Sequence, residues 1–358
     1  MKKNFLVLIT LIALIVIAFY FNKDDSSKEK DNLSVGVIAP LTGPVSAAGE
    51  DLVDGMMLAK DKLNSSVVLY VEDSKSVGAE GVTAAEKLFN THKIDILVSM
   101  QSAVVITVVS IADRYNTPFI ATAISKNEFT NMSQYTFRLF TPASLDAGMM
   151  ANLANKLNMQ NMAAIYIQDE YGTSMEEHFE KNFKGKITKK EAFSVSELDF
   201  KTILMKIDEK SVDGVFFVGY NPHYIQLFKQ IKELNKNITI ITNNNAGGNF
   251  VRNMTGNLLN NAYAVLPVST IDKNNTFAEE YRKKYNKEPD WTAPFGYDIM
   301  LFLDYLQREK GNLTNSLYKI EIDGWNGKIH FDKNREISIN MTTIYFDYGK
   351  IIPIGEIK

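Results

Sequence analysis

Hydroxyl-bearing side chains follow several apolar runs of the sequence, at points where helices are expected to begin. Ser102 comes shortly after the run 94–99, which we predict to be a strand. Ligands of parallel sheets bind outside the carboxyl ends of the strands. A hydroxyl beside the free N–H groups and the positive dipole end of a helix suits a carboxylate. The other interpretation is a plain helix N-cap, a position that serine favours in any protein.

Three tyrosines are further candidates for contact with a ligand. Tyr171 and Tyr220 follow the predicted strands 162–167 and 214–218, and Tyr297 opens a predicted helix. A tyrosine ring can cover an apolar ligand body while its hydroxyl binds a polar end. The alternative is ordinary packing on a lobe surface or in a core. Tyr297 is the weakest candidate, because aromatic residues that open helices are often core residues.

Catalytic and metal-binding patterns are absent from the sequence. The chain contains no cysteine, which excludes disulfides, thiol nucleophiles and Fe–S clusters. Its four histidines lie far apart, and no H-E-x-x-H, G-x-S-x-G or G-x-x-x-x-G-K-[ST] motif occurs. The net charge of −3 gives no sign of a nucleic-acid partner. We therefore expect neither a cofactor nor an enzyme, although scattered side chains can still converge in a fold.

The candidate residues must be positioned by a repeated βα arrangement. From residue 33 onward, short runs rich in Val, Ile and Leu alternate with stretches of helical periodicity. This order predicts an α/β fold in which parallel sheets carry helices on both faces. The order occurs twice, and 358 residues exceed one hydrophobic core, so two doubly wound lobes are expected. The predicted strands are 33–38, 67–71, 94–99, 118–121, 162–167, 214–218, 238–241 and 263–266, with 327–331 and 342–346 near the C-terminus.

The N-terminus has the layout of an export signal. Lys2 and Lys3 precede an apolar run over residues 5–21, and a polar stretch follows to residue 32. The run is longer than a usual signal core of about 7–15 residues and reaches about 17, the lower limit for a membrane span. Small residues at a cleavage position are lacking after Phe21, which slightly favours an uncleaved anchor over a cleaved signal. In either case the remaining chain is expected outside the membrane, in the periplasm or another extracytoplasmic space.

Five short motifs occur in order along the chain, each in the expected strand–turn–helix context. They are Thr42-Gly43-Pro44, Asp169-Glu170-Tyr171-Gly172, Phe277 and Tyr281 with Pro289, Tyr297-Asp298, and Asp323-Gly324-Trp325-Asn326-Gly327 with Phe331-Asp332. Together they resemble the leucine/isoleucine/valine-binding family of type I periplasmic binding proteins. The resemblance covers about residues 33–346.

This resemblance implies two α/β lobes that are joined by three crossings and close on a ligand in the cleft. Carried over to this chain, residues 33–140 and 267–324 form lobe one, and 141–266 and 325–358 form lobe two. Residues 1–32 are then the signal or anchor with its polar linker. The implied function is capture, by a monomer, of an amino-acid-like or carboxylate or amide solute for an ABC permease. A membrane-tethered sensor of the same fold is the alternative.

The resemblance also assigns a carboxylate-binding end of the ligand site. Ser102 matches the serine with which the family binds the ligand carboxylate. Ala123 and Ser125 match a turn that binds the same carboxylate through its backbone and a hydroxyl. Ala48 falls where some members carry a large aromatic side chain, which implies more room at that wall.

The opposite end of the implied site departs from the family pattern. Asn245 stands where the amino-acid binders carry an acidic residue that pairs with the ligand ammonium. Asparagine brings no charge, and charge-assisted hydrogen bonds are roughly twice as strong as neutral ones. Either another carboxylate substitutes, with Glu50, Asp169 and Glu170 the nearest in sequence, or the ligand is not an α-amino acid.

Overall fold

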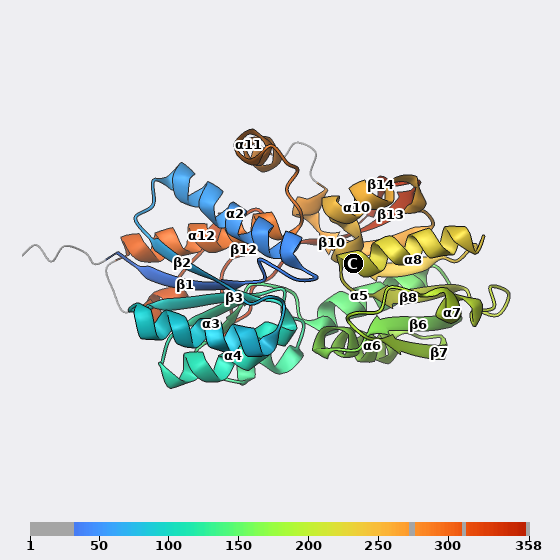
Figure 1. The fold of residues 1–358 in the computed structure, drawn as a ribbon, viewed down its shortest axis with the longest axis horizontal. Coiled ribbons are helices and arrows are strands. Elements are labelled where there is room, and N and C mark those ends of the chain that lie inside the picture. Colours follow the sequence, from blue (N-terminus) through green and yellow to red (C-terminus); the bar gives the residue numbers. More distant parts are fainter. Residues whose placement is uncertain (1–31, 272–275, 310–312, 356–358) are drawn as a thin grey trace, which may run out of the picture.

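Residues 32–271, 276–309 and 313–355 are described in the computed structural model of the chain. Two lobes lie side by side, each with its own sheet between layers of helices (Figure 1). The expected fold class, two doubly wound α/β lobes, is confirmed. The expected signal or anchor helix over residues 5–21 lies outside the described residues. Within the described ranges, no helix combines the length and apolarity needed to cross a bilayer.

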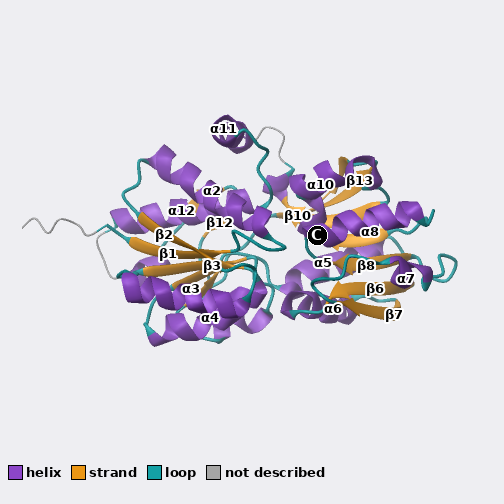
Figure 2. Cartoon of the chain, viewed as in Figure 1, coloured by secondary structure: helices purple, strands orange, loops and turns teal. Residues whose placement is uncertain are grey.

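The first lobe contains a five-stranded parallel sheet with the order β2-β1-β3-β4-β5. Helices cover both of its faces (Figure 2). Alternate residues of β1 point to opposite faces: Val35 and Val37 pack with α2 and α12, whereas Ile38 packs with α3 and α4. The strands are β1 (Ser34–Ala39), β2 (Val68–Asp73), β3 (Ile96–Met100), β4 (Phe119–Thr122) and β5 (Thr136–Arg138), with a hairpin of β11 (Ile322–Gly324) and β12 (Gly327–Ile329). The helices are α2 (Ser46–Leu63), α3 (Gly78–Thr91), α4 (Ser102–Arg114), α11 (Thr276–Tyr285), α12 (Thr292–Arg308) and α13 (Leu313–Leu317).

Helices α2 and α12 approach each other closely although they are far apart in the sequence. A Cβ atom added at Gly55 would lie 2.0 Å from the carbonyl oxygen of Ala293, and one at Gly296 would lie 1.9 Å from that of Leu52. Only glycine permits this backbone contact. The contact fixes the start of α12, which the ligand pocket also uses.

The second lobe contains a seven-stranded sheet with the order β14-β13-β10-β9-β8-β6-β7. The strands β6 to β10 run parallel, and β13 and β14 add an antiparallel edge. The strands are β6 (Asn161–Ile167), β7 (Lys186–Phe193), β8 (Gly214–Val218), β9 (Ile240–Asn243), β10 (Ala262–Pro267), β13 (Met341–Asp347) and β14 (Lys350–Gly355). The helices are α5 (Ala143–Lys156), α6 (Glu170–Asn182), α7 (Lys201–Met205), α8 (Asn221–Glu233), α9 (Asn244–Gly247) and α10 (Asn249–Thr255).

The segment after β12 packs with the first lobe rather than the second. Ile329, Phe331 and Ile339 are buried in the core that α2 and α12 share. Arg138, the fully buried last residue of β5, forms an ion pair of 3.1 Å with Glu336. In place of the expected boundary at residue 324, we therefore propose that residues 325–339 belong to lobe one and that the last crossing lies near residue 340.

Candidate ligand-binding site

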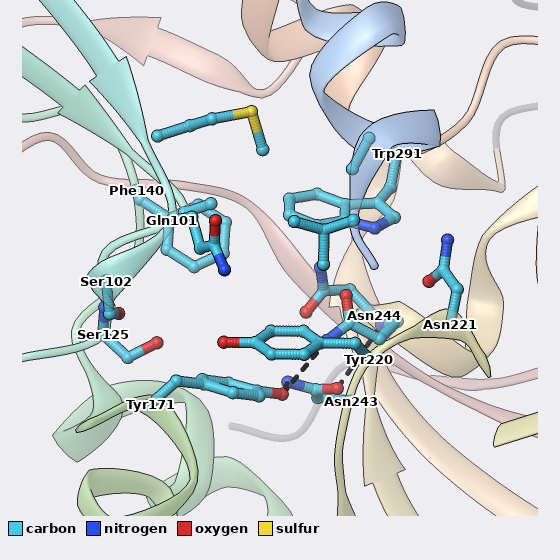
Figure 3. Close-up of a pocket in the computed structure, with 15 residues that line it drawn as sticks. Gln101, Ser102, Ser125, Phe140, Tyr171, Tyr220, Asn221, Asn243, Asn244 and Trp291 are labelled. Atoms are coloured by element: carbon cyan, nitrogen blue, oxygen red, sulfur yellow. Dashed lines mark hydrogen bonds between the residues drawn. The ribbon is translucent and has the colours of Figure 1, made fainter. Parts of the chain in front are cut away.

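A pocket lies between the two lobes, at the carboxyl ends of the strands of both sheets (Figure 3). The space between its lining atoms, with the solvent of its open mouth included, is about 530 Å³. Of the seven residues expected in the site, six line this pocket. Its full lining is Val45, Ala48, Met100, Gln101, Ser102, Ala123, Ser125, Phe140, Tyr171, Tyr220, Asn221, Asn243, Asn244, Asn245 and Trp291.

The first lobe contributes two buried serines from the ends of adjacent strands. Ser102 begins α4, and its Oγ accepts a hydrogen bond of 3.1 Å from the backbone N–H of Ser125, which follows β4. No side chain caps α4, so the Ser102 hydroxyl does not act as a plain N-cap. The N–H groups of Val104 and Val105 donate to the carbonyl of Gln101, the N-cap of α4, whereas the N–H groups of the first two helical residues have no acceptor within a helix. This arrangement offers hydrogen-bond donors and a positive dipole end to a carboxylate.

Two lining residues of the first lobe adopt left-handed backbone conformations. Gln101 has φ 75° and Ala123 has φ 50°, and neither is glycine. Such conformations cost of order 1–3 kcal/mol and persist where the surrounding fold imposes them. They turn the chain sharply at the ends of β3 and β4. Ala123 therefore contributes to the pocket through its backbone, since its side chain carries no polar group.

The second lobe contributes two tyrosines that lie against each other. The rings of Tyr171 and Tyr220 stack with centroids 5.7 Å apart and an interplanar angle of 20°. Asp169 holds both tyrosines in place. Its carboxylate caps α6, the helix whose first turn carries Tyr171, by accepting a hydrogen bond of 2.9 Å from the Gly172 N–H. It also accepts a hydrogen bond of 2.6 Å from the Tyr220 hydroxyl. Burial raises the pKa of both tyrosine hydroxyls well above 10, so both rings are neutral at physiological pH.

An asparagine cluster stands at the end of β9. The side-chain amides of Asn243 and Asn245 both donate to the Tyr171 hydroxyl, at 2.7 and 3.2 Å. The Asn245 amide also donates to the Gly219 carbonyl at 3.0 Å. Asn245 thus lines the pocket as expected, and its amide hydrogens are engaged in holding the tyrosine and the end of β8.

None of the fifteen residues that line the pocket is charged. Of the acidic residues considered as substitutes for Asn245, Asp169 is engaged by Tyr220 and Gly172, Glu170 forms an ion pair of 3.1 Å with Lys126, and Glu50 is exposed on α2. None of these three carboxylates lines the pocket. The acceptors and donors inside it are hydroxyls, amides and backbone groups.

One buried carboxyl lies behind the pocket wall. Asp146, on α5, is 2% exposed, and the amide of Asn243 donates to it at the long distance of 3.5 Å. Its second oxygen has no hydrogen-bond partner among the described residues. Burial raises the pKa of Asp146 to about 7. Asn243 therefore separates this carboxyl from the pocket.

The model of the family described as periplasmic binding protein matches residues 32–345 of the chain. The chain belongs to the periplasmic binding protein family. This is a family of solute-binding proteins, and membership implies an extracytoplasmic location. The expected resemblance to leucine/isoleucine/valine-binding proteins is confirmed by the relatives that the chain matches.

The matched relatives of this periplasmic binding protein are distant. The Leu/Ile/Val-binding protein BraC3 of Rhizobium johnstonii is 28% identical over 59% of this chain and 60% of its own length. A leucine-, isoleucine-, valine-, threonine- and alanine-binding protein of Pseudomonas aeruginosa is 21% identical over 81% of this chain and 80% of its own. The match thus spans somewhat less than two thirds of the first relative.

Solved structures share the fold of this family member at low identity. The branched-chain amino acid substrate-binding protein LivJ of Streptococcus pneumoniae, in complex with isoleucine, superposes with a TM-score of 0.82 at 22% identity, over 90% of this chain and 98% of its own. A solute-binding protein of an ABC transporter of R. palustris, in complex with benzoate, gives 0.84 at 20% identity, over 90% and 96%.

Tyr297 is the one expected site residue that the fold of this binding protein does not bring to the pocket. It is 5% exposed in the core of the first lobe, with its ring 5.6 Å from that of Phe277 and 6.3 Å from that of Trp325. Its surroundings are those of a core residue, which was the alternative interpretation of a tyrosine that opens a helix. We leave Tyr297 out of the proposed site.

Several lining residues were not anticipated from the sequence. Asn221 and Asn244 directly follow predicted strands or their turns, so the same rule that selected Tyr220 could have found them. Phe140 and Trp291 gave no such signal. Phe140 lies in the crossing between the lobes, and Trp291 comes just before α12, whose position depends on its long-range contact with α2.

Proposed function

We propose that this chain is a solute-binding protein that captures a small carboxylate-bearing metabolite between its two lobes and presents it to an ABC permease. The observation that carries the proposal is the pocket between the lobes, which both lobes line at the carboxyl ends of their strands. A ligand held there bridges the lobes and stabilises the closed arrangement. The residues proposed to hold it are Ser102, Ala123, Ser125, Tyr171, Tyr220 and Asn245.

The carboxylate end of the ligand is proposed to lie beside Ser102 and Ser125. Both side chains lie on the same side of the pocket (Figure 3), next to the first turn of α4. Backbone N–H groups at a helix start favour an anion without any cationic side chain. Isoleucine and benzoate, which are bound by the two solved structures described above, share a carboxylate group.

Ligand-dependent thermal unfolding of the purified protein tests this proposal. We would screen small carboxylates, amino acids and amides, because a ligand at 100 times its dissociation constant stabilises the folded state by about 2.7 kcal/mol. A reproducible rise in midpoint with a carboxylate supports the proposal. If no solute in a broad panel raises the midpoint, the binding function is contradicted.

The transport role needs a separate measurement in cells. Deletion of the gene is expected to abolish uptake of the same solute that stabilises the purified protein. Normal uptake in the deletion strain, with binding intact in the purified protein, would contradict the permease as partner while leaving the binding function in place.

A further inference from the structure

Polar groups stand at two opposite ends of the pocket. Ser102 and Ser125 lie at one end, and the amides of Asn221 and Asn244 lie toward the other, with the tyrosine pair below and Trp291 above (Figure 3). Among the described residues, no side chain forms a hydrogen bond to the Asn221 or Asn244 amides. Both residues are buried, with exposed fractions of 6% and 3%. They are therefore available to a ligand that reaches across the pocket.

The two ends differ in what they offer to a charged group. The serine end has the first turn of α4, whose N–H groups and dipole favour negative charge. The asparagine end has only neutral amides, each of which can donate and accept a hydrogen bond. A carboxylate is compensated at the first end, whereas a cation has no counter-charge at the second.

A buried ammonium would also find no carboxylate nearby to accept it. The lining contains no acidic side chain, and Asp169 is already hydrogen-bonded to the Tyr220 hydroxyl and the Gly172 N–H. Asp146 lies behind the Asn243 amide. Burial of an unpaired charge is costly, whereas neutral hydroxyl or amide groups are satisfied by the asparagines.

The walls between the two ends are mostly apolar and aromatic, and the exception is the neutral amide of Gln101, whose buried oxygen has no hydrogen-bond partner among the described residues. Met100, Phe140 and Trp291 come from the first lobe, and the stacked rings of Tyr171 and Tyr220 come from the second. The rings of Phe140 and Trp291 are 5.8 Å apart and tilted by 44°. Such walls suit a flat or branched apolar body.

We infer that the pocket selects monocarboxylates with an apolar body and no α-ammonium group, and that a neutral hydroxyl or amide at the far end of the ligand binds Asn221 and Asn244. This inference rests on the proposed function and names the ligand class of the same site. It makes Asn221, Asn244 and Asn245 residues that determine specificity.

Matched ligand pairs that differ only in the ammonium group test the inference. Leucine is compared with 4-methylpentanoate, phenylalanine with 3-phenylpropanoate, and tyrosine with 3-(4-hydroxyphenyl)propanoate, by calorimetry on the full chain at pH 8. At this pH Asp146 is largely ionised, so if its carboxylate can pair with the ligand ammonium, the effect on binding is seen under these conditions. We expect the acid without the ammonium to bind at least tenfold more tightly in each pair that binds, and the 4-hydroxyphenyl acid more tightly than its phenyl analogue.

Two variants examine the charge directly. Asn244→Asp adds a carboxylate of nearly the same shape at a side chain that makes no hydrogen bond, and we expect it to reduce the preference at least tenfold. Asp146→Asn is the matched control behind the wall, and we expect the ratio within each pair to stay unchanged. A selective loss of amino-acid binding in Asp146→Asn would overturn the inference, because Asp146 would then reach the ligand.

The outcomes separate this inference from the proposed function. If an amino acid binds as tightly as its partner or more tightly, the inference is overturned and solute binding stands. The same holds if no monocarboxylate of the set binds but another solute of the broad panel does. If no solute of either panel binds, both are overturned.

Discussion

The carboxylate of Asp290, in the first lobe, accepts a hydrogen bond of 3.2 Å from the backbone N–H of Phe250, in the second. Its other oxygen accepts from the N–H of Trp291 at 2.7 Å, and Trp291 lines the ligand pocket. Asp290 is in turn held by Asp51 of α2, which accepts from the Asp290 N–H at 2.9 Å. One carboxylate therefore connects a wall of the pocket, the start of α10 and the contact between the lobes.

Asp290→Asn is expected to loosen the contact between the lobes. Asparagine keeps one acceptor oxygen and replaces the other by an NH₂ group, so one of the two N–H groups loses its partner. Loss of a hydrogen bond to a charged group costs about 1.5–3 kcal/mol, and ligand affinity should fall by up to this amount. Calorimetry measures the affinity, and small-angle scattering measures the radius of gyration. Asp323→Asn, on an exposed strand, is the control, and equal affinities for both variants would contradict the role of Asp290.

Asp146 makes stability depend on pH. Its pKa is raised from 3.8 to about 7 by burial, so the folded state holds this proton more tightly than the unfolded state does. The free energy of unfolding therefore falls as the pH rises from about 4 to about 7. Each pKa unit is worth about 1.36 kcal/mol, which gives a loss of up to roughly 4 kcal/mol.

Asp146→Asn should remove that loss. We expect the variant to be more stable than the parent above pH 7 and equally stable at pH 4, as measured by urea unfolding at each pH. Asp298→Asn is the contrasting control: burial raises the pKa of this carboxyl as well, to about 6, but its carboxylate accepts three hydrogen bonds of 2.7–3.0 Å from Trp325 and Asn326, and the variant loses part of them. Its replacement should destabilise the protein at pH 8. If Asp298→Asn is more stable than the parent at pH 8, or if Asp146→Asn is only as stable as the parent at this pH, the predicted roles of the two carboxyls are contradicted.

Ser102→Ala is expected to weaken a carboxylate ligand. The variant loses the hydroxyl that the proposal places on the ligand and that accepts the Ser125 N–H. The expected cost is roughly 1–3 kcal/mol in binding free energy. Ser99→Ala, on the preceding strand β3, is a matched control, since its buried hydroxyl has no partner among the described residues and lies outside the pocket lining. Unchanged affinity in Ser102→Ala would remove this residue from the site.

Gly172→Ala tests how Tyr171 is positioned. A Cβ atom at residue 172 would lie 1.9 Å from the carbonyl oxygen of Ile167, so the first turn of α6 must shift. Overpacking of this kind costs about 1–3 kcal/mol, and the shift should also lower ligand affinity. Gly148→Ala is the control in α5: its nearest neighbour would be 3.8 Å away, and alanine should raise helix stability by up to about 1 kcal/mol. Thermal unfolding compares the two, and a tolerated Gly172→Ala would contradict the close approach.

The buried strands could be predicted because they are apolar runs. The predicted strand 214–218 has the bounds that the structure gives β8, and the predicted strand 162–167 differs from β6 by one residue. The strand β7, with the sequence Lys-Ile-Thr-Lys-Lys-Glu-Ala-Phe, was missed. It lies at the edge of its sheet, where its side chains are largely accessible. An edge strand can therefore be polar, and it then lacks the run of apolar residues on which the prediction of strands depends.

The site was predictable where it follows strands and unpredictable where it depends on tertiary contacts. Ser102, Tyr171 and Tyr220 could be selected because ligands bind at strand ends. Trp291 reaches the pocket because α12 is held against α2, a contact that local periodicity does not encode. The absence of charge from the lining also required the fold, since only the structure places Asp169 on Tyr220 and Asp146 behind Asn243.

The close contact of α2 with α12 has a consequence for the order in which the chain folds. The Thr292 hydroxyl donates to the Ala48 carbonyl at 2.8 Å across 244 residues of sequence. The core of the first lobe therefore needs helix α12 from far down the chain before it can close, whereas β6 to β10 follow one another in a single stretch. Contacts of such long sequence separation form slowly. During synthesis the second lobe can thus assemble its parallel sheet first. The N-terminal part of the first lobe is synthesised earlier, but it completes its packing only after α12 has been made.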